Sequence, residues 1–87
     1  MRLQITRQFE RDYARLPPEM QGRVRATIQK FETDPRHPSL HTKKMKGVQN
    51  RWEIRVSDSY RITFQIDGHV VVLRHVGTHD ILKRESL

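Results

Sequence analysis

The spacing of the apolar residues changes once along this chain, close to residue 36, and this change restricts the folds open to it. Before that point apolar residues recur every three or four positions, as on one helix face: Phe9, Tyr13 and Leu16, then Met20, Val24, Ile28 and Phe31. After it they alternate with polar residues, as in half-buried strands: Trp52, Ile54 and Val56, then Tyr60, Ile62, Phe64 and Ile66. Helices followed by strands predict an α+β fold.

Local signals predict where these elements begin and end. Residues 2–6 form a short run expected to be an edge strand, and Thr6 is placed to cap the helix that follows. Pro17-Pro18 ends that helix and begins a second one, because proline is tolerated in a first helical turn, and Asp34-Pro35 stops the second. A polar tail follows Gly77. We therefore expect the order β-α-α-β-β-β: a helical hairpin packed on one face of a small antiparallel sheet, with the other face open.

Length and composition limit the class of protein. The 87 residues allow one domain with a modest core, so we expect a single domain over residues 1–87. The absence of cysteine excludes disulfides and cysteine-ligated metals and suits a reducing cytoplasm. The first residues lack the apolar run of a signal peptide, and no stretch approaches the ~20 apolar residues of a membrane span. We expect a cytoplasmic protein with no membrane partner and no small-molecule cofactor.

The chain is strongly basic, with 17 Lys and Arg against 10 Asp and Glu, a net charge of +7. Such an excess attracts polyanions, which include nucleic acids, ribosomes, acidic proteins and anionic membranes. Charge alone fixes no function, so a basic protein without such a partner stays an alternative. His75 and His79 are four residues apart but lie on a strand end and a loop, without a carboxylate cluster nearby. We expect no metal and no other cofactor.

The turns between the last strands predict which residues are neighbours. A three-residue turn at residues 57–59 places Arg55 beside Arg61. A two-residue turn at Asp67-Gly68 places Arg61 beside Arg74. Three arginines are then expected in a row, about 4.8 Å apart from strand to strand. Like charges opposite one another destabilise a sheet by up to about 1 kcal/mol per pair, so the row favours an anion site.

Other polar residues border the same face. Glu53, one row away, is able to pair with an arginine instead, which would make the row an ordinary surface network. Three lysines are basic enough to attract a phosphate backbone, or else protect an edge strand: Lys43, Lys44 and Lys46. His79 follows a strand end, where functional groups concentrate, and histidine is the natural acid or base near neutral pH. A loop histidine without a function is the alternative.

Three segments together resemble the RelE/ParE toxin superfamily. They are the basic run Lys-Lys-Met-Lys-Gly at 43–47, the strand pair Trp-Glu-Ile-Arg-Val-Ser-Asp-Ser-Tyr-Arg-Ile-Thr-Phe-Gln-Ile at 52–66, and Leu-Arg-His-Val-Gly-Thr-His at 73–79. Each motif is short, but their order and spacing are fairly specific, and with the helical hairpin they cover almost the whole chain. The resemblance implies a RelE-like fold and a toxin of a type II toxin–antitoxin system.

RelE-type members of this superfamily are mRNA interferases that cleave transcripts in the ribosomal A site without a metal. The RNA 2′-hydroxyl attacks the adjacent phosphate, and arginines suit the charge that develops there. The resemblance implies that Arg61 is the transition-state arginine, that Arg55 stands at a strand-lysine position, and that His79 is an acid or base, as in YafQ-like members. It also implies mRNA and the ribosome as partners, together with a cognate antitoxin whose acidic segment wraps the basic surface.

Two features depart from that pattern. Glu53 stands where RelE has a second lysine, and the stretch that carries a late aromatic residue in the family here reads Ile81-Leu82-Lys83. An inhibitor of DNA gyrase without nuclease activity, as in ParE-like members, is therefore the main alternative to an endoribonuclease. A non-catalytic nucleic-acid-binding domain is the third reading, and the presence of His79 argues against it.

Overall fold

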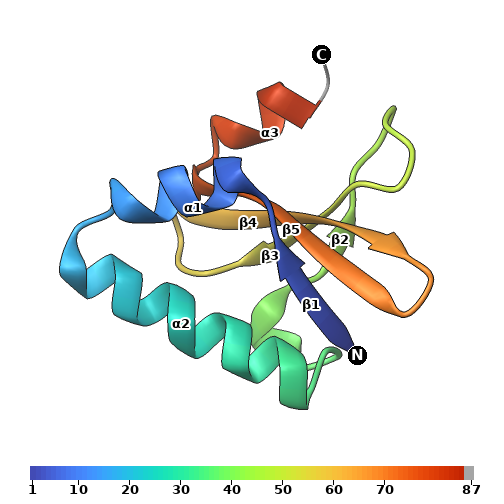
Figure 1. Cartoon of the computed structure of the whole chain (residues 1–87), viewed down its shortest axis with the longest axis horizontal. Helices are drawn as coiled ribbons and strands as arrows, with labels where there is room; N and C mark the ends of the chain where they lie inside the picture. The colour runs from blue at the N-terminus through green and yellow to red at the C-terminus, as the bar shows by residue number, and fades with distance from the viewer. Residues whose placement is uncertain (86–87) are drawn as a thin grey trace.

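The computed structural model describes residues 1–85, whose strands form one five-stranded sheet in the order β1-β5-β4-β3-β2 (Figure 1). The elements along the chain are β1 (Arg2–Ile5), α1 (Arg7–Ala14), α2 (Pro18–Thr33), the 3-10 turn η1 (Pro38–Leu40), β2 (Lys43–Lys44), β3 (Trp52–Arg55), β4 (Tyr60–Asp67), β5 (Val70–Thr78) and α3 (Ile81–Glu85). The α+β class is confirmed. The sheet is mixed rather than antiparallel, because β1 pairs with β5 in parallel.

The helical hairpin forms where the sequence predicts it. Thr6 caps α1, because its Oγ1 accepts a hydrogen bond from the Phe9 backbone N–H at 3.0 Å. Pro18 begins α2, and the helix ends at Thr33, directly before Asp34. The Thr6 hydroxyl also donates to the carbonyl of Arg74, so the cap fastens α1 to β5. None of the helices among residues 1–85 is long and apolar enough to cross a membrane.

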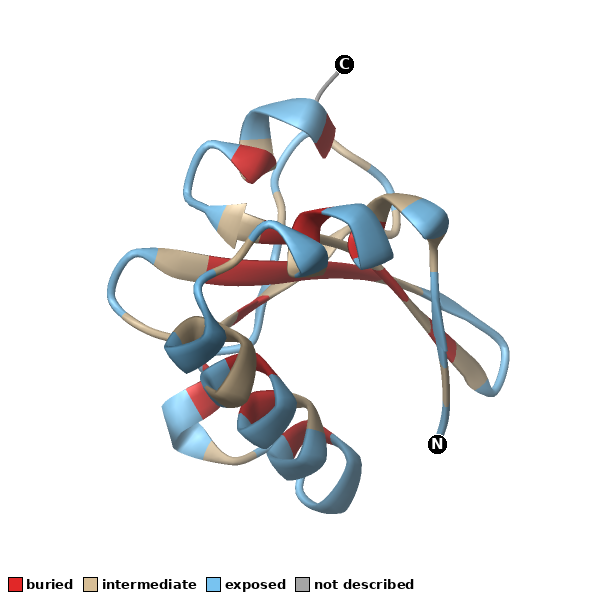
Figure 2. Cartoon of the chain, turned by 60° about the vertical axis from the view of Figure 1, so that its left-hand side comes forward, coloured by how far each residue is buried: buried red, intermediate tan, exposed pale blue. Residues whose placement is uncertain are grey.

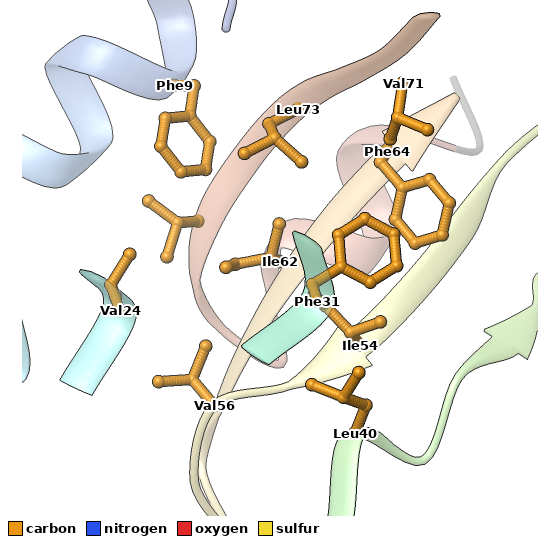
Figure 3. Close-up of a cluster of buried hydrophobic side chains, with 11 residues drawn as sticks. Phe9, Val24, Phe31, Leu40, Ile54, Val56, Ile62, Phe64, Val71 and Leu73 are labelled. Carbon is orange, nitrogen blue, oxygen red and sulfur yellow. The ribbon is translucent and has the colours of Figure 1, made fainter. Parts of the chain in front are cut away.

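The core lies between α2 and the sheet (Figures 2 and 3). The Phe31 ring of α2 lies 5.0 Å from the ring of Phe64, and Trp52 stacks on the same Phe64 at 6.2 Å. Burying each such side chain contributes roughly 1.5–3 kcal/mol. The buried cluster comprises Phe9, Val24, Phe31, Leu40, Ile54, Val56, Ile62, Phe64, Val71, Leu73 and Val76. Glu53 and Arg55 alternate with these residues and therefore lie on the opposite face.

The predicted register between β4 and β5 is wrong. The two loop residues are Gly68 and His69, since Asp67 pairs with Val70 and Gly68 has a φ of +61°. A glycine with positive φ at the first loop position is typical of a type II′ turn. A bulge then leaves Arg74 without a direct partner on β4.

As a result, Arg61 lies opposite Gly77 rather than opposite Arg74. The turn moves each partner by two residues, which leaves the side chains on their faces, and the bulge moves the partners of residues 60–63 by a third residue. Between Phe64 and Asp67 the alternation of apolar and polar residues is therefore the same in both registers, whereas beyond the bulge the buried position on β5 moves from Leu73 to Val76, three residues on. The row of three adjacent arginines is not formed; the Arg55–Arg61 pair is.

The sheet face opposite the core is only partly open. Residues expected to be a polar tail form α3, which packs on β4 and β5 through the buried Ile81 (Figure 1). A Cβ atom added at Gly77 would stand 2.8 Å from Cγ2 of Ile81. The missing side chain of Gly77 is what allows α3 to approach the sheet.

Candidate functional site

A hollow of about 540 Å³ lies on this second face, beside α3. Its lining includes four residues predicted to act in catalysis or phosphate binding: Lys43, Arg55, Arg61 and His79. His41, Thr42, Glu53 and Leu82 complete the lining, and we call this hollow the basic cavity. It combines three permanently cationic side chains and two histidines with a single carboxylate.

Strand pairing carries these residues to one place. Arg55 and Arg61 are direct neighbours on β3 and β4, as the three-residue turn predicts. Lys43 on β2 lies opposite Glu53 on β3. Thr78 lies opposite Tyr60, so the residue after it, His79, arrives at the same end of the sheet as Arg61. Four consecutive strands, β2 to β5, therefore bring these residues to one site.

Arg61 is held in position by the turn between β3 and β4. Its Nη1 donates to the carbonyl oxygens of Ser57 at 2.6 Å, Tyr60 at 3.0 Å and Asp58 at 3.1 Å. Its Nε lies 3.8 Å from Oε1 of Glu53, and the residue is 8% exposed. The cation is fixed before any ligand arrives, which is the arrangement that preorganised electrostatic stabilisation needs.

Arg55 is less fully paired. Its Nε is buried and has no hydrogen-bond partner among the described residues. Buried polar groups are nearly always satisfied, so the missing partner of this covered Nε marks an incompletely paired guanidinium, and the residue lines the cavity, where its positive charge favours an anion.

His41 lines the basic cavity but was not predicted as a site residue. It is exposed and has a left-handed backbone, with φ 45° and ψ 46°, and its N–H closes the η1 turn by donating to the carbonyl of Pro38. Residues other than glycine are uncommon in this conformation and cluster at functional sites. In the sequence His41 only opens a basic run, and nothing there indicates the backbone turn that brings it to His79.

Three predicted phosphate ligands do not line the basic cavity. Lys44 points to the other face, where its Nζ lies 5.9 Å from the Trp52 ring, and Lys46 is exposed in the turn after β2. Arg74 donates through Nε to both carboxylate oxygens of Glu85 at 3.0 Å and through Nη1 to Gln65 at 2.6 Å. The predicted register alone places Arg74 beside Arg61, and that register is wrong because Arg61 lies opposite Gly77.

Glu53 pairs with an arginine, as the alternative interpretation of the arginine row predicts. Its carboxylate lies within ion-pair distance of Arg61 and opposite Lys43, and it offsets one of the three fixed cations. The cavity keeps two positive charges before either histidine is protonated. The fixed charge of its lining therefore stays positive, with a weakened field around Arg61.

Comparison with known proteins places this geometry in a family. A family model described as the ParE toxin of type II toxin–antitoxin systems, parDE, matches residues 3–82. A comparison with curated protein sequences finds no significant match.

Solved toxin structures share the fold at low sequence identity. The RelB–RelE antitoxin–toxin complex from Methanococcus jannaschii is 22% identical, with a TM-score of 0.74 over 92% of this chain and 94% of that chain. YafQ from E. coli strain BL21(DE3) is 10% identical, with a TM-score of 0.78 over 94% and 98%. A YoeB/ParE toxin from Agrobacterium tumefaciens is 19% identical, with a TM-score of 0.75 over 91% and 99%. With the family model covering nearly all of its length, the chain belongs to the ParE toxin family of type II toxin–antitoxin systems, within the RelE/ParE superfamily.

Proposed function

We propose that this toxin is a metal-independent endoribonuclease that binds mRNA in the basic cavity and cleaves it on the ribosome, in the cytoplasm. The observation that carries the proposal is the shared lining of that cavity: two arginines beside two histidines, Arg55 and Arg61 beside His41 and His79. These side chains are of the types that cleavage of RNA by its own 2′-hydroxyl requires.

The reaction has three requirements. A base removes the proton of the 2′-hydroxyl, the 2′-oxygen forms a bond to phosphorus, and the bond from phosphorus to the 5′-oxygen breaks as an acid protonates that oxygen. The products are a 2′,3′-cyclic phosphate and a free 5′-hydroxyl. Negative charge builds on the phosphoryl oxygens in between, and fixed cations that point at them lower the barrier.

The cavity residues divide among these tasks. Arg61, fixed by the turn carbonyls, and Arg55, which lines the cavity beside it, are suited to hold the phosphoryl oxygens. His79 and His41 are suited to proton transfer, one neutral as the base and the other protonated as the acid. Lys43 adds positive charge that attracts the RNA backbone.

We also propose a cognate antitoxin with an acidic segment as the toxin's protein partner. Support comes from solved relatives of the same fold that were crystallised as antitoxin–toxin complexes, RelB–RelE and DinJ–YafQ. A net charge of +7 on 87 residues favours an acidic partner.

The second candidate function is inhibition of DNA gyrase without RNA cleavage. Two observations favour it: Glu53 lies 3.8 Å from the arginine that a nuclease would need free, and the family model is that of the ParE toxin. In addition, α3 presents Ile81, Leu82 and Lys83 where interferases carry an aromatic residue.

One experiment in cells separates the two. After induction, transcript ends are mapped by primer extension and plasmid supercoiling is measured in the same cultures. His79→Ala removes an exposed cavity histidine, and His69→Ala, in the exposed β4–β5 loop, is the matched control. Discrete cuts that persist with His69→Ala and vanish with His79→Ala support the nuclease, whereas lost negative supercoiling without cuts overturns it in favour of gyrase inhibition.

A further inference from the structure

A second hollow, of about 570 Å³, adjoins the basic cavity and lies between α2, η1 and the β3–β4 turn. We call it the flanking cavity, and we propose that it is a second RNA subsite, which binds the phosphate backbone of nucleotides next to the one that is cleaved. This inference rests on the proposed function, because it gives the substrate of the basic cavity its path across the protein.

One face of α2 supplies the outer wall of the flanking cavity. Arg23, Thr27 and Lys30 are spaced i, i+4 and i+7, so their side chains project from the same side of the helix. Arg23 and Lys30 are both exposed, and the Nζ of Lys30 lies 3.0 Å from Oγ of Ser39, which orients it at the wall. The helix therefore presents two cations to the hollow, while the buried Thr27 hydroxyl between them donates to the carbonyl of Arg23 at 2.8 Å.

The two cavities share part of their walls. Arg55 and His41 line both of them. The Nε of Arg55 is buried and lacks a hydrogen-bond partner among residues 1–85. A planar guanidinium that lines both hollows is able to hold the phosphate that joins a nucleotide in one cavity to a nucleotide in the next. The shared wall makes one continuous path for a strand.

The charge of the flanking cavity identifies the chemistry of its occupant. The lining contains three cationic side chains, Arg23, Lys30 and Arg55, and a single carboxylate, that of Asp58. Most of the other lining residues are polar. An apolar ligand or an apolar peptide face would leave these cations desolvated and unpaired. Single-stranded RNA carries one negative charge per nucleotide and suits a groove whose cations follow its backbone.

Binding of RNA of two lengths tests the subsite. The probes are 2′-O-methyl oligonucleotides, which have no 2′-hydroxyl to attack: a dinucleotide that reaches only the basic cavity and an octanucleotide that spans both. Arg23→Ala/Lys30→Ala removes the two α2 cations, and Arg7→Ala/Arg11→Ala removes two exposed cations from α1 as the matched control. Affinities are measured by fluorescence competition at several salt concentrations.

We expect the Arg23→Ala/Lys30→Ala variant to bind the octanucleotide about tenfold more weakly, with a salt slope smaller by about 1.4, as loss of two phosphate contacts to a single strand requires. Its affinity for the dinucleotide stays at the wild-type value, and the control variant binds both probes as wild type does.

Three results would overturn the subsite. Equal octanucleotide affinity in the two double variants removes it and leaves the basic cavity as the RNA site. If the Arg23→Ala/Lys30→Ala variant binds the dinucleotide and the octanucleotide more weakly by the same factor, the substitutions act only through the overall charge of the protein. If the Arg23→Ala/Lys30→Ala variant binds the octanucleotide normally but loses affinity for a polyglutamate peptide, the flanking cavity is assigned to an acidic protein segment. If wild-type protein binds neither oligonucleotide, the proposed function fails as well.

Discussion

Arg61 and Gly77 lie directly opposite each other on β4 and β5, and Ile81 of α3 occupies the space that a side chain at Gly77 would take. This relationship connects the strongest candidate for phosphate binding with the packing of the C-terminal helix. A change at Gly77 therefore acts on α3 first and on the basic cavity through it, because Leu82 of α3 is part of the cavity lining.

Gly77→Ala is expected to lower the free energy of unfolding by about 1–3 kcal/mol, because its Cβ would stand 2.8 Å from Ile81 Cγ2 and overpack that contact. Gly22→Ala is the matched control. There the added Cβ lies 3.6 Å from Arg25 inside α2, and alanine is favoured over glycine in a helix by roughly 0.5–1 kcal/mol. Urea unfolding midpoints should move in opposite directions, and a neutral Gly77→Ala would show that α3 is not packed as described.

Asp12→Ala is expected to destabilise the protein by roughly 1–3 kcal/mol. The buried carboxylate accepts from the Val76 backbone N–H at 3.1 Å and from Gln8 Nε2 at 2.8 Å, so its loss leaves a buried N–H of β5 without an acceptor. Glu32→Ala, exposed near the end of α2, should change stability by no more than about 0.5 kcal/mol. Equal thermal unfolding temperatures for the two variants would contradict the role of Asp12.

Arg74→Ala and Arg55→Ala are expected to separate stability from RNA binding. Arg74 pairs with Glu85, whose side chain is 1% exposed, so its removal should cost about 1–3 kcal/mol of stability by leaving a buried carboxylate underpaired. Arg55 lines both cavities, and its loss should weaken binding of a single-stranded RNA by roughly tenfold with a smaller effect on stability. Denaturation and RNA titration on both variants check this; the reverse pattern would restore Arg74 to the site.

Glu53→Gln is expected to strengthen RNA binding severalfold, since a carboxylate near a phosphate site costs on the order of 1 kcal/mol in a water-like medium. The change also frees Arg61 from its neighbour at 3.8 Å. Glu10→Gln, exposed on α1, removes the same charge away from the cavity and serves as the control. Unchanged or weaker RNA binding by Glu53→Gln would mean that phosphate does not approach Glu53.

Local signals were enough to predict much of this fold. The cap at Thr6 and the prolines at 17, 18 and 35 fixed the two long helices, and a three-residue turn fixed the pairing of Arg55 with Arg61. These features depend on residues close together in sequence. The resemblance of short motifs then pointed to the family that the family model confirms.

The features that the sequence did not predict have one property in common, which is that apolar–polar patterning and turn residues alone do not encode them. The turn between β4 and β5 shifts the pairing by two residues, which keeps apolar residues on their faces, and the bulge at Arg74 adds a third, so Arg61 faces Gly77 and not Arg74. The five-residue α3 has too few residues to be stable alone and forms because Ile81 fits over Gly77. His41 reaches the cavity only through its left-handed backbone.

The central claim is cleavage of RNA by its own 2′-hydroxyl in the basic cavity. The most direct test is a cleavage assay on ribosomes programmed with an mRNA that carries a single 2′-deoxynucleotide at the mapped cut. We predict that wild-type toxin cuts the all-ribose mRNA to a 2′,3′-cyclic phosphate end and leaves the substituted position intact, and that His79→Ala cuts neither. Equal cutting of both mRNAs, or no cutting of either by the wild-type toxin, would contradict the account.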